Sequence, residues 1–179
     1  MKSLSVAAVG LLFAFSVCLL TNGSAAGEKK AAPGDPEEAK LKPVKPAPDG
    51  SLCLRASGAR PVGPKIKYMP EWKAFGWWTD KDQAEWIVEV GEAGKYDVWL
   101  EWSVDDKHSG NPFVFEVGEA RLNGKVGKSG SWETYVKAKI GQMELKAGSQ
   151  PAVFKPGGEF KTALLDLREI RLVPAAKEK

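Results

Sequence analysis

Side chains capable of acid–base or metal chemistry are few in this sequence. His108, the one histidine, lies beside the adjacent carboxylates Asp105 and Asp106 in what we interpret as a solvated loop. Glu159 and Asp166 could be posed as the carboxylate pair that a glycoside hydrolase places around the scissile bond, but their spacing does not favour this over surface charge. One His and two Cys cannot supply a Cys/His zinc site. We therefore predict no catalytic residues, no metal site and no enzyme activity.

The seven tryptophans offer a different chemistry, because a flat indole can pack against the C–H face of a sugar ring. Binding sites of this kind combine an apolar wall with a few polar groups. Trp77 and Trp78 are adjacent, so an extended chain points them to opposite sides, and one can be presented while the other is buried. Trp132 follows a glycine-containing turn and shares parity with Val136, which leaves both a binding role and a core role open.

Trp99 differs from the tryptophans that share parity with apolar neighbours. Trp86 and Trp102 alternate with polar residues in the way expected of core side chains. Trp99 instead has the parity of Asp97 and Glu101, which indicates an outward position or one beneath a loop. It is a candidate for a second binding site.

Alternating apolar and polar residues predict that the elements carrying these side chains are strands. The clearest is residues 94–104, where Tyr96, Val98, Leu100 and Trp102 share one face. Further strands are expected over residues 52–56, 85–90, 112–117, 121–122, 132–140, 142–146, 152–154 and 163–173. The last strand changes phase, which predicts a β-bulge near Arg168. Turn signals, Asn123-Gly124 among them, separate about nine strands. We predict an all-β, antiparallel β-sandwich of the jelly-roll type.

The first 26 residues have the features of a secretory signal peptide. Lys2 precedes an uncharged apolar stretch over residues 4–20, and Ser24 and Ala26 supply the small residues expected before a cleavage site. The apolar stretch is shorter than a membrane span requires, so we expect no membrane span after cleavage. We predict an exported protein, located in the periplasm, at the cell surface or outside the cell.

Residues 27–50 are rich in Pro, Ala, Lys and Glu, which predicts a disordered linker. The folded domain is then expected over residues 51–174, followed by a tail over 175–179. After signal cleavage only Cys53 remains, so no intrachain disulfide can form, and a buried Cys53 is expected. The net charge of +3 is close to balanced and gives no electrostatic case for nucleic-acid binding.

The order of several segments carries a resemblance to a known family. They are Phe75-Gly76-Trp77-Trp78, residues 85–90, Gly94-Lys95-Tyr96-Asp97-Val98, Ser129-Gly130-Ser131-Trp132, Ala147-Gly148 and residues 165–172. Over residues 51–174 the chain resembles the galactose-binding-domain-like jelly roll, most closely family 6 and related carbohydrate-binding modules.

The resemblance implies that two aromatic rings on apical loops clamp a sugar, and the matching positions are Trp77 and Trp132, assisted by Trp78. The family usually supplies an Asn from the loop before the last strand. That loop has no Asn here, and Glu159 or Lys161 are the candidate substitutes. The family's binding of sugar on the sheet face implies the second-site role for Trp99.

The family's structural calcium site uses a Glu-x-Glu pair on the first strand. Residues 52–56 contain no carboxylate, and Ca²⁺ requires six to eight oxygen ligands. We therefore predict that this site is absent and that no cofactor is bound.

The leading hypothesis is an exported, non-catalytic carbohydrate-binding module for a polysaccharide or oligosaccharide. The alternative is the same jelly-roll scaffold without a sugar site, which would bind a protein partner or act as a structural domain at the cell surface. Exposed rings of Trp77 and Trp132 that line a common gap would favour the sugar-binding hypothesis.

Overall fold

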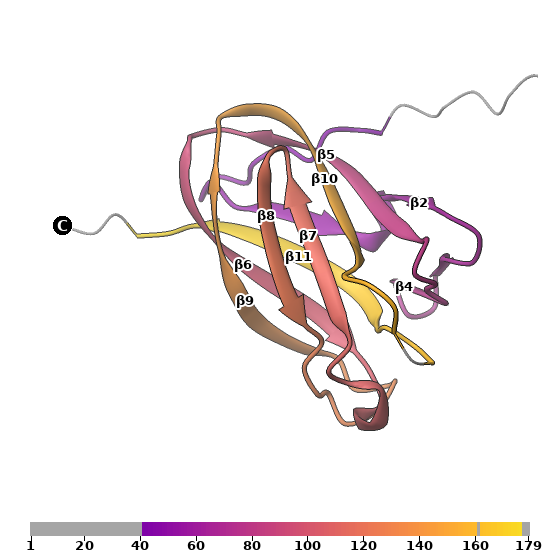
Figure 1. Cartoon of the computed structure of the whole chain (residues 1–179). Coiled ribbons are helices and arrows are strands. Elements are labelled where there is room, and N and C mark those ends of the chain that lie inside the picture. Colours follow the sequence, from indigo (N-terminus) through magenta and orange to yellow (C-terminus); the bar gives the residue numbers. More distant parts are fainter. Residues whose placement is uncertain (1–40, 161, 177–179) are drawn as a thin grey trace, which may run out of the picture. The chain divides into compact units, whose positions relative to one another are not determined.

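The computed structural model describes residues 41–160 and 162–176, in which eleven strands form two antiparallel sheets (Figure 1). The predicted signal peptide, the linker up to residue 40, Lys161 and residues 177–179 lie outside the described residues. One sheet has six strands: β1 (Leu52–Arg55), β3 (Lys67–Met69), β4 (Ala74–Gly76), β6 (Gly94–Ser103), β9 (Val136–Leu145) and β11 (Asp166–Pro174). The other has five: β2 (Arg60–Val62), β5 (Gln83–Val90), β7 (Pro112–Val117), β8 (Ala120–Lys125) and β10 (Gly148–Pro156). The prediction of an all-β antiparallel sandwich is confirmed.

The core lies between the two sheets and consists of the side chains that the alternation placed inward. On β6 the predicted face is buried, from Tyr96 to Trp102. Trp86 on β5 is also buried, and its indole N–H donates to the carbonyl of Arg55 at the end of β1, 2.9 Å away. This bond connects one sheet to the other and satisfies the polar atom of a large buried ring.

The region after β7 differs from the prediction, because Asn123-Gly124 is not a turn. Both residues lie inside β8, and the chain reverses earlier, at Gly118 and Glu119. Gly124 faces the ring of Phe113, and a Cβ at this position would lie 2.3 Å from that ring. The glycine therefore permits close packing within a strand rather than a reversal of the chain.

The strands predicted over residues 132–140 and 142–146 form a single strand in the structure, β9, and Trp132 lies outside it. Residues 132–135 form a loop, and β9 then runs without interruption through Gly141, where its register against β6 shifts beside Trp99. The predicted bulge in the last strand is confirmed, since the register of β11 shifts between Leu167 and Glu169.

The end of the expected linker is in contact with the sandwich. The amide of Val44 donates to the carbonyl of Ile87 at 2.8 Å, and the amide of Glu89 donates to the carbonyl of Val44 at 2.9 Å. Val44 thereby forms a short parallel bridge with β5 and packs against the core. Contacts with the domain consequently begin before Ser51.

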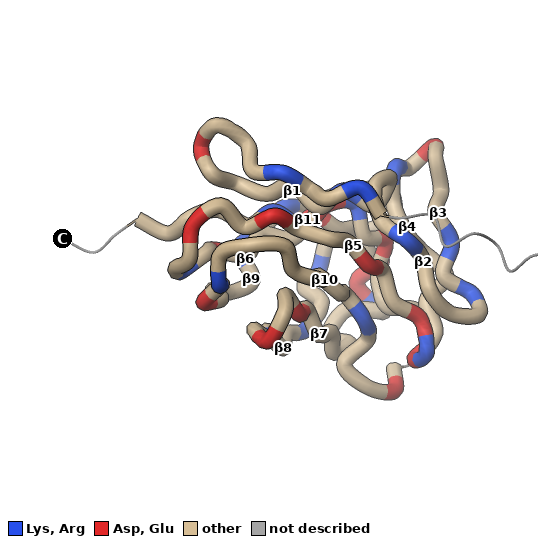
Figure 2. Tube along the Cα trace, turned by 90° about the horizontal axis from the view of Figure 1, so that it is seen from above, with Lys and Arg blue, Asp and Glu red and all other residues tan. Residues whose placement is uncertain are grey.

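Four connections meet at one end of the sandwich, at the lower right of Figure 1. The pairing of Asp166 with Ser103 places the start of β11 at the end of β6, and the pairing of Pro156 with Phe113 brings the end of β10 beside the start of β7. The segments that precede β5, join β6 to β7, precede β9 and join β10 to β11 therefore emerge together. Figure 2 shows that acidic and basic residues are interspersed along the strands and loops.

Candidate functional site

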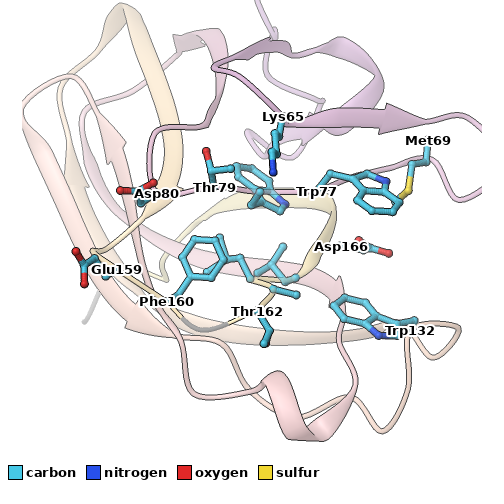
Figure 3. A pocket seen from close by; sticks show the side chains of 14 residues that line it. Lys65, Met69, Trp77, Thr79, Asp80, Trp132, Glu159, Phe160, Thr162 and Asp166 are labelled. Carbon is cyan, nitrogen blue, oxygen red and sulfur yellow. The ribbon is translucent and has the colours of Figure 1, made fainter.

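A pocket of about 830 Å³ opens at this end of the sandwich (Figure 3). This volume lies within the range of roughly 300–1,000 Å³ typical of small-molecule sites. Its walls combine aromatic and apolar side chains with a few polar groups: Lys65, Met69, Trp77, Trp78, Thr79, Asp80, Trp132, Glu159, Phe160, Thr162 and Asp166 line it, together with residues 163–165. The predicted residues Trp77, Trp78, Trp132 and Glu159 are brought together here.

Of the two adjacent tryptophans, Trp77 is presented to solvent and Trp78 is buried. Trp77 is 70% exposed, whereas Trp78 is 6% exposed. The indole N–H of Trp78 donates to the carbonyl of Phe75 at 3.3 Å, and its ring meets Phe154 edge to face. Trp78 thus anchors the segment that presents Trp77 to the pocket.

The presented tryptophan has an unusual backbone conformation. Trp77 has a φ of 63°, in the left-handed region that large side chains seldom adopt. Thr162, across the pocket, has a φ of 69°. Of the three non-glycine residues with positive φ in the described part of the chain, two therefore line this pocket. Strained conformations of this kind persist where the surrounding contacts enforce them, and they cluster at functional sites.

The turn that follows Trp77 is held by Asp82. Its buried carboxylate accepts from the Thr79 hydroxyl at 2.7 Å and from the amides of Thr79 and Lys65 at 2.5 and 3.1 Å. Burial alone would raise the pKa of Asp82, but these hydrogen bonds outweigh burial and lower it. An ionised Asp82 therefore fixes the turn between Trp77 and β5.

Trp132 forms the opposite wall and is backed by His108. The two rings lie 5.8 Å apart between centroids, tilted by 36°. The His108 Nδ1 is also hydrogen-bonded to the hydroxyl of Thr162. His108, which we interpreted from the sequence as part of a solvated loop, therefore contacts two residues that line the pocket.

The loop before Trp132 is held by Ser129. Its hydroxyl accepts from the amide of Val104 at 2.7 Å and donates to the carbonyl of the same residue at 2.8 Å. This pair of bonds ties the loop to the end of β6, so the position of Trp132 is set by a buried polar contact.

Asp166 lies between the exposed indole of Trp77 and the partly buried indole of Trp132 in the view of Figure 3. Its side chain is half-buried, and within residues 41–160 and 162–176 no group donates a hydrogen bond to its carboxylate or pairs with it. Burial accordingly raises its pKa to about 6. Gly76 makes room for it, since a Cβ there would lie 2.6 Å from Asp166 Oδ1. Asp166 is not among the binding residues predicted from the sequence.

The remaining predicted residues lie elsewhere or at the margin. Glu159 is exposed at the rim, and Lys161 lies outside the described residues. Trp99 does not line the pocket: it lies on the outer face of the six-stranded sheet, paired with Arg171 on one side and Lys139 on the other. Its second-site role stays a prediction.

No group of three or more His, Cys, Asp or Glu side chains within the described ranges is placed to hold a metal ion. The predicted absence of the calcium site is not tested by this finding, because backbone carbonyls also ligate calcium. In the same part of the chain, no helix has the length and apolar character needed to cross a membrane.

Comparison with known proteins identifies the fold. No family model matches the sequence, and no curated protein matches it. Among solved structures, a family 35 carbohydrate-binding module from Clostridium thermocellum matches with a TM-score of 0.58 at 13% identity, covering 70% of this chain and 98% of that one. The C-terminal family 6 module of a marine laminarinase from Zobellia galactanivorans matches with a TM-score of 0.54 at 14% identity, covering 69% and 98%.

A third match, an exo-β-1,3-galactanase from Phanerochaete chrysosporium in complex with β-1,3-galactotriose, has a TM-score of 0.56 at 16% identity. It covers 69% of this chain, which spans only 29% of the enzyme's length. At these identities the matches show the fold alone, and they confirm the resemblance in that respect: the sandwich has the jelly-roll fold of carbohydrate-binding modules.

Proposed function

We propose that this protein is a non-catalytic carbohydrate-binding module that holds a sugar in the pocket between Trp77 and Trp132. The observation that carries the proposal is the exposure of Trp77 and the placement of Trp132 on another wall of the same pocket. The solved modules that share the fold support it.

The composition of the pocket suits a sugar. Indole faces cover the C–H surface of a pyranose, whereas its hydroxyl groups require a small number of fixed polar partners. Asp166 and Thr79 supply such partners between and beside the rings. With so few contacts, a single site is expected to bind with a Kd of about 1 μM to 1 mM.

The placement of the carboxylates supports a binding function over hydrolysis. A glycosidase needs two carboxyl groups facing one bond. In Figure 3, Asp166 lies between the indoles, whereas Glu159 lies at the far end of the pocket beyond Phe160. Export of the module is part of the proposal and rests on the signal-like residues 1–26.

Titration of intrinsic tryptophan fluorescence tests the proposal. The purified protein is titrated with a panel of monosaccharides and oligosaccharides, and Trp77→Ala and Trp132→Ala are measured beside it. Trp72→Ala is the matched control, because Trp72 is also exposed, at 39%, but does not line the pocket. Circular dichroism verifies that each variant is folded.

We expect saturable binding that weakens at least thirtyfold in both pocket variants and is unchanged in Trp72→Ala. Binding that survives in either pocket variant would contradict the clamp. The absence of binding to the whole panel would contradict the function and favour the alternative, a jelly-roll scaffold that binds a protein partner.

A further inference from the structure

We propose that the sugar bound in this pocket carries a free ammonium group, as a hexosamine does, and that Asp166 receives this ammonium between Trp77 and Trp132. The inference rests on the proposed function and names its ligand class. It starts from the one carboxylate among the described residues of the pocket that combines partial burial with the absence of a partner.

The cation closest to Asp166 along β11 is committed elsewhere. Arg168 donates to Glu101 at 3.1 Å and to the carbonyl of Trp72 at 3.2 Å. Its guanidinium lies 3.3 Å from the centroid of the Tyr135 ring. The fold therefore leaves the charge of Asp166 facing the pocket rather than neutralising it.

The surroundings of Asp166 favour a cation over a neutral group. Indole faces attract cations, and this attraction grows when the cation is removed from water. An ammonium also forms a charge-assisted hydrogen bond with a carboxylate, which is about twice as strong as a bond between neutral groups. Two indoles and one carboxylate around the same space thus combine both contributions.

The Asp166 carboxylate is already partly removed from water in the folded protein without a ligand. Burial raises the pKa of Asp166 to about 6, which means that the ionised form is held there at a cost. A cationic ligand relieves this cost on binding, whereas a neutral hydroxyl relieves only a part of it.

The remaining charged residues of the described lining are two carboxylates and one cation, so with Asp166 the described lining carries more acidic than basic groups. Asp80 and Glu159 are exposed at the rim, and Lys65 is the one cation among the described lining residues. Uronic acids and sulfated sugars would meet repulsion from Asp166. We therefore expect discrimination against acidic sugars as well as preference for amino sugars.

The experiment compares matched ligands by fluorescence titration near pH 6.5, where both the sugar amine and Asp166 are largely charged. Hexosamines of the gluco and galacto series are each measured beside the N-acetylated and unsubstituted sugars of the same configuration, and beside the uronic acid. The proteins are the unmodified chain, Asp166→Asn, and Glu119→Gln as a control carboxylate that does not line the pocket.

We expect the better hexosamine to bind about tenfold more tightly than its N-acetylated and unsubstituted counterparts. This preference should disappear in Asp166→Asn, with binding of the neutral sugar retained, and should persist in Glu119→Gln. The uronic acid should bind most weakly of the four.

Equal affinities in the unmodified protein, or a preference that survives in Asp166→Asn, would overturn the inference and leave the sugar-binding proposal intact. Tighter binding of the uronic acid would overturn it as well. The comparison of ligands on the unmodified protein is decisive even if Asp166→Asn does not fold. If none of the sugars binds, the proposed function fails together with the inference.

Discussion

Two carboxylates three residues apart on β11 have opposite surroundings, because one is paired with cations and the other is not. Glu169 is buried and accepts from Arg55 at 3.4 Å, from Lys137 at 3.2 Å and from Arg171 at 3.1 Å. Asp166 is half-buried at the start of the same strand and has no such partner within the described residues.

The consequence is visible in the opposite directions in which the two pKa values shift. For Glu169, burial alone would raise the pKa, but Lys137 and Arg171 outweigh burial and lower it. For Asp166, burial acts without opposition and raises the pKa to about 6. A carboxylate that serves the structure is neutralised by its neighbours, whereas one left open to a pocket lowers stability and is available for a ligand.

The largest expected effect concerns the paired carboxylate. Glu169→Gln removes the charge shared by three cations, and we expect it to lower the free energy of unfolding by about 2 kcal/mol. Partial exposure of the three partners keeps the loss below that of a fully buried network. Urea denaturation measures it, with Glu119→Gln as the control, because Glu119 pairs with Lys146 at the exposed surface. Equal losses of unfolding free energy in Glu169→Gln and Glu119→Gln would contradict the special structural role of the buried carboxylate.

The unpaired carboxylate should show the opposite sign. The folded pKa of Asp166 lies above its ordinary value of 3.8, so the protonated form stabilises the fold at low pH and this stabilisation is lost as the pH rises through about 6. Asp166→Asn should therefore raise the free energy of unfolding by about 1–2 kcal/mol at pH 8, after allowance for solvent screening, and leave it unchanged at pH 3.5. Denaturation of both proteins at each pH measures the difference, and destabilisation at pH 8 would contradict the prediction.

Ligand binding should follow the same titration. If Asp166 receives an ammonium, hexosamine affinity should fall about fivefold between pH 7 and pH 5, because protonation removes the charge. The charged and titratable groups around it are Lys65 in the pocket, Arg168 on its own strand and Tyr135, whose pKa is raised by burial. Calorimetric titration across this range measures the profile, which should be flat in Asp166→Asn and retained in His108→Gln. A profile that depends on His108 instead would assign the effect to the imidazole.

The smallest expected effect concerns His108, which backs the wall of the pocket that Trp132 forms. His108→Ala removes the ring that backs Trp132 and the hydrogen bond to Thr162, and we expect a loss of about threefold in sugar affinity. His108→Phe retains the ring contact and should recover part of the loss. Affinities measured by fluorescence separate these variants, and an unchanged affinity in His108→Ala would show that the wall does not depend on this contact.

Much of the fold could be predicted because alternation is a local signal. The inward faces of β5, β6 and β7 and the bulge beside Arg168 follow from side-chain parity alone. Strands of three residues, such as β3 and β4, are too short to show a period. The Asn123-Gly124 dipeptide is typical of a turn, and only the distant ring of Phe113 explains why it lies in a strand.

The candidate site could be predicted only in part for the same reason. Trp77 and Trp132 were identified from residue type and from the resemblance, and the structure places both at one pocket. Asp166 and His108 gave no local signal, because their importance depends on contacts across the fold: Gly76 makes room for one, and Trp132 packs on the other. Asp166 could have been noticed as an acidic residue flanked by Leu165 and Leu167.

The bridge made by Val44 has a mechanical consequence. Two hydrogen bonds hold this residue to β5, whereas β1 begins only at Leu52. Under tension applied from the N-terminal side, these two bonds are the first among the described residues to bear load, and β5 remains paired with β10 after their rupture. The released segment of about eight residues can span at most about 3.3 Å per residue, or roughly 25 Å in total, once the hydrogen-bonded turn between Ala47 and Ser51 has also opened. A domain attached in this way can yield by a fixed length before its own strands are strained.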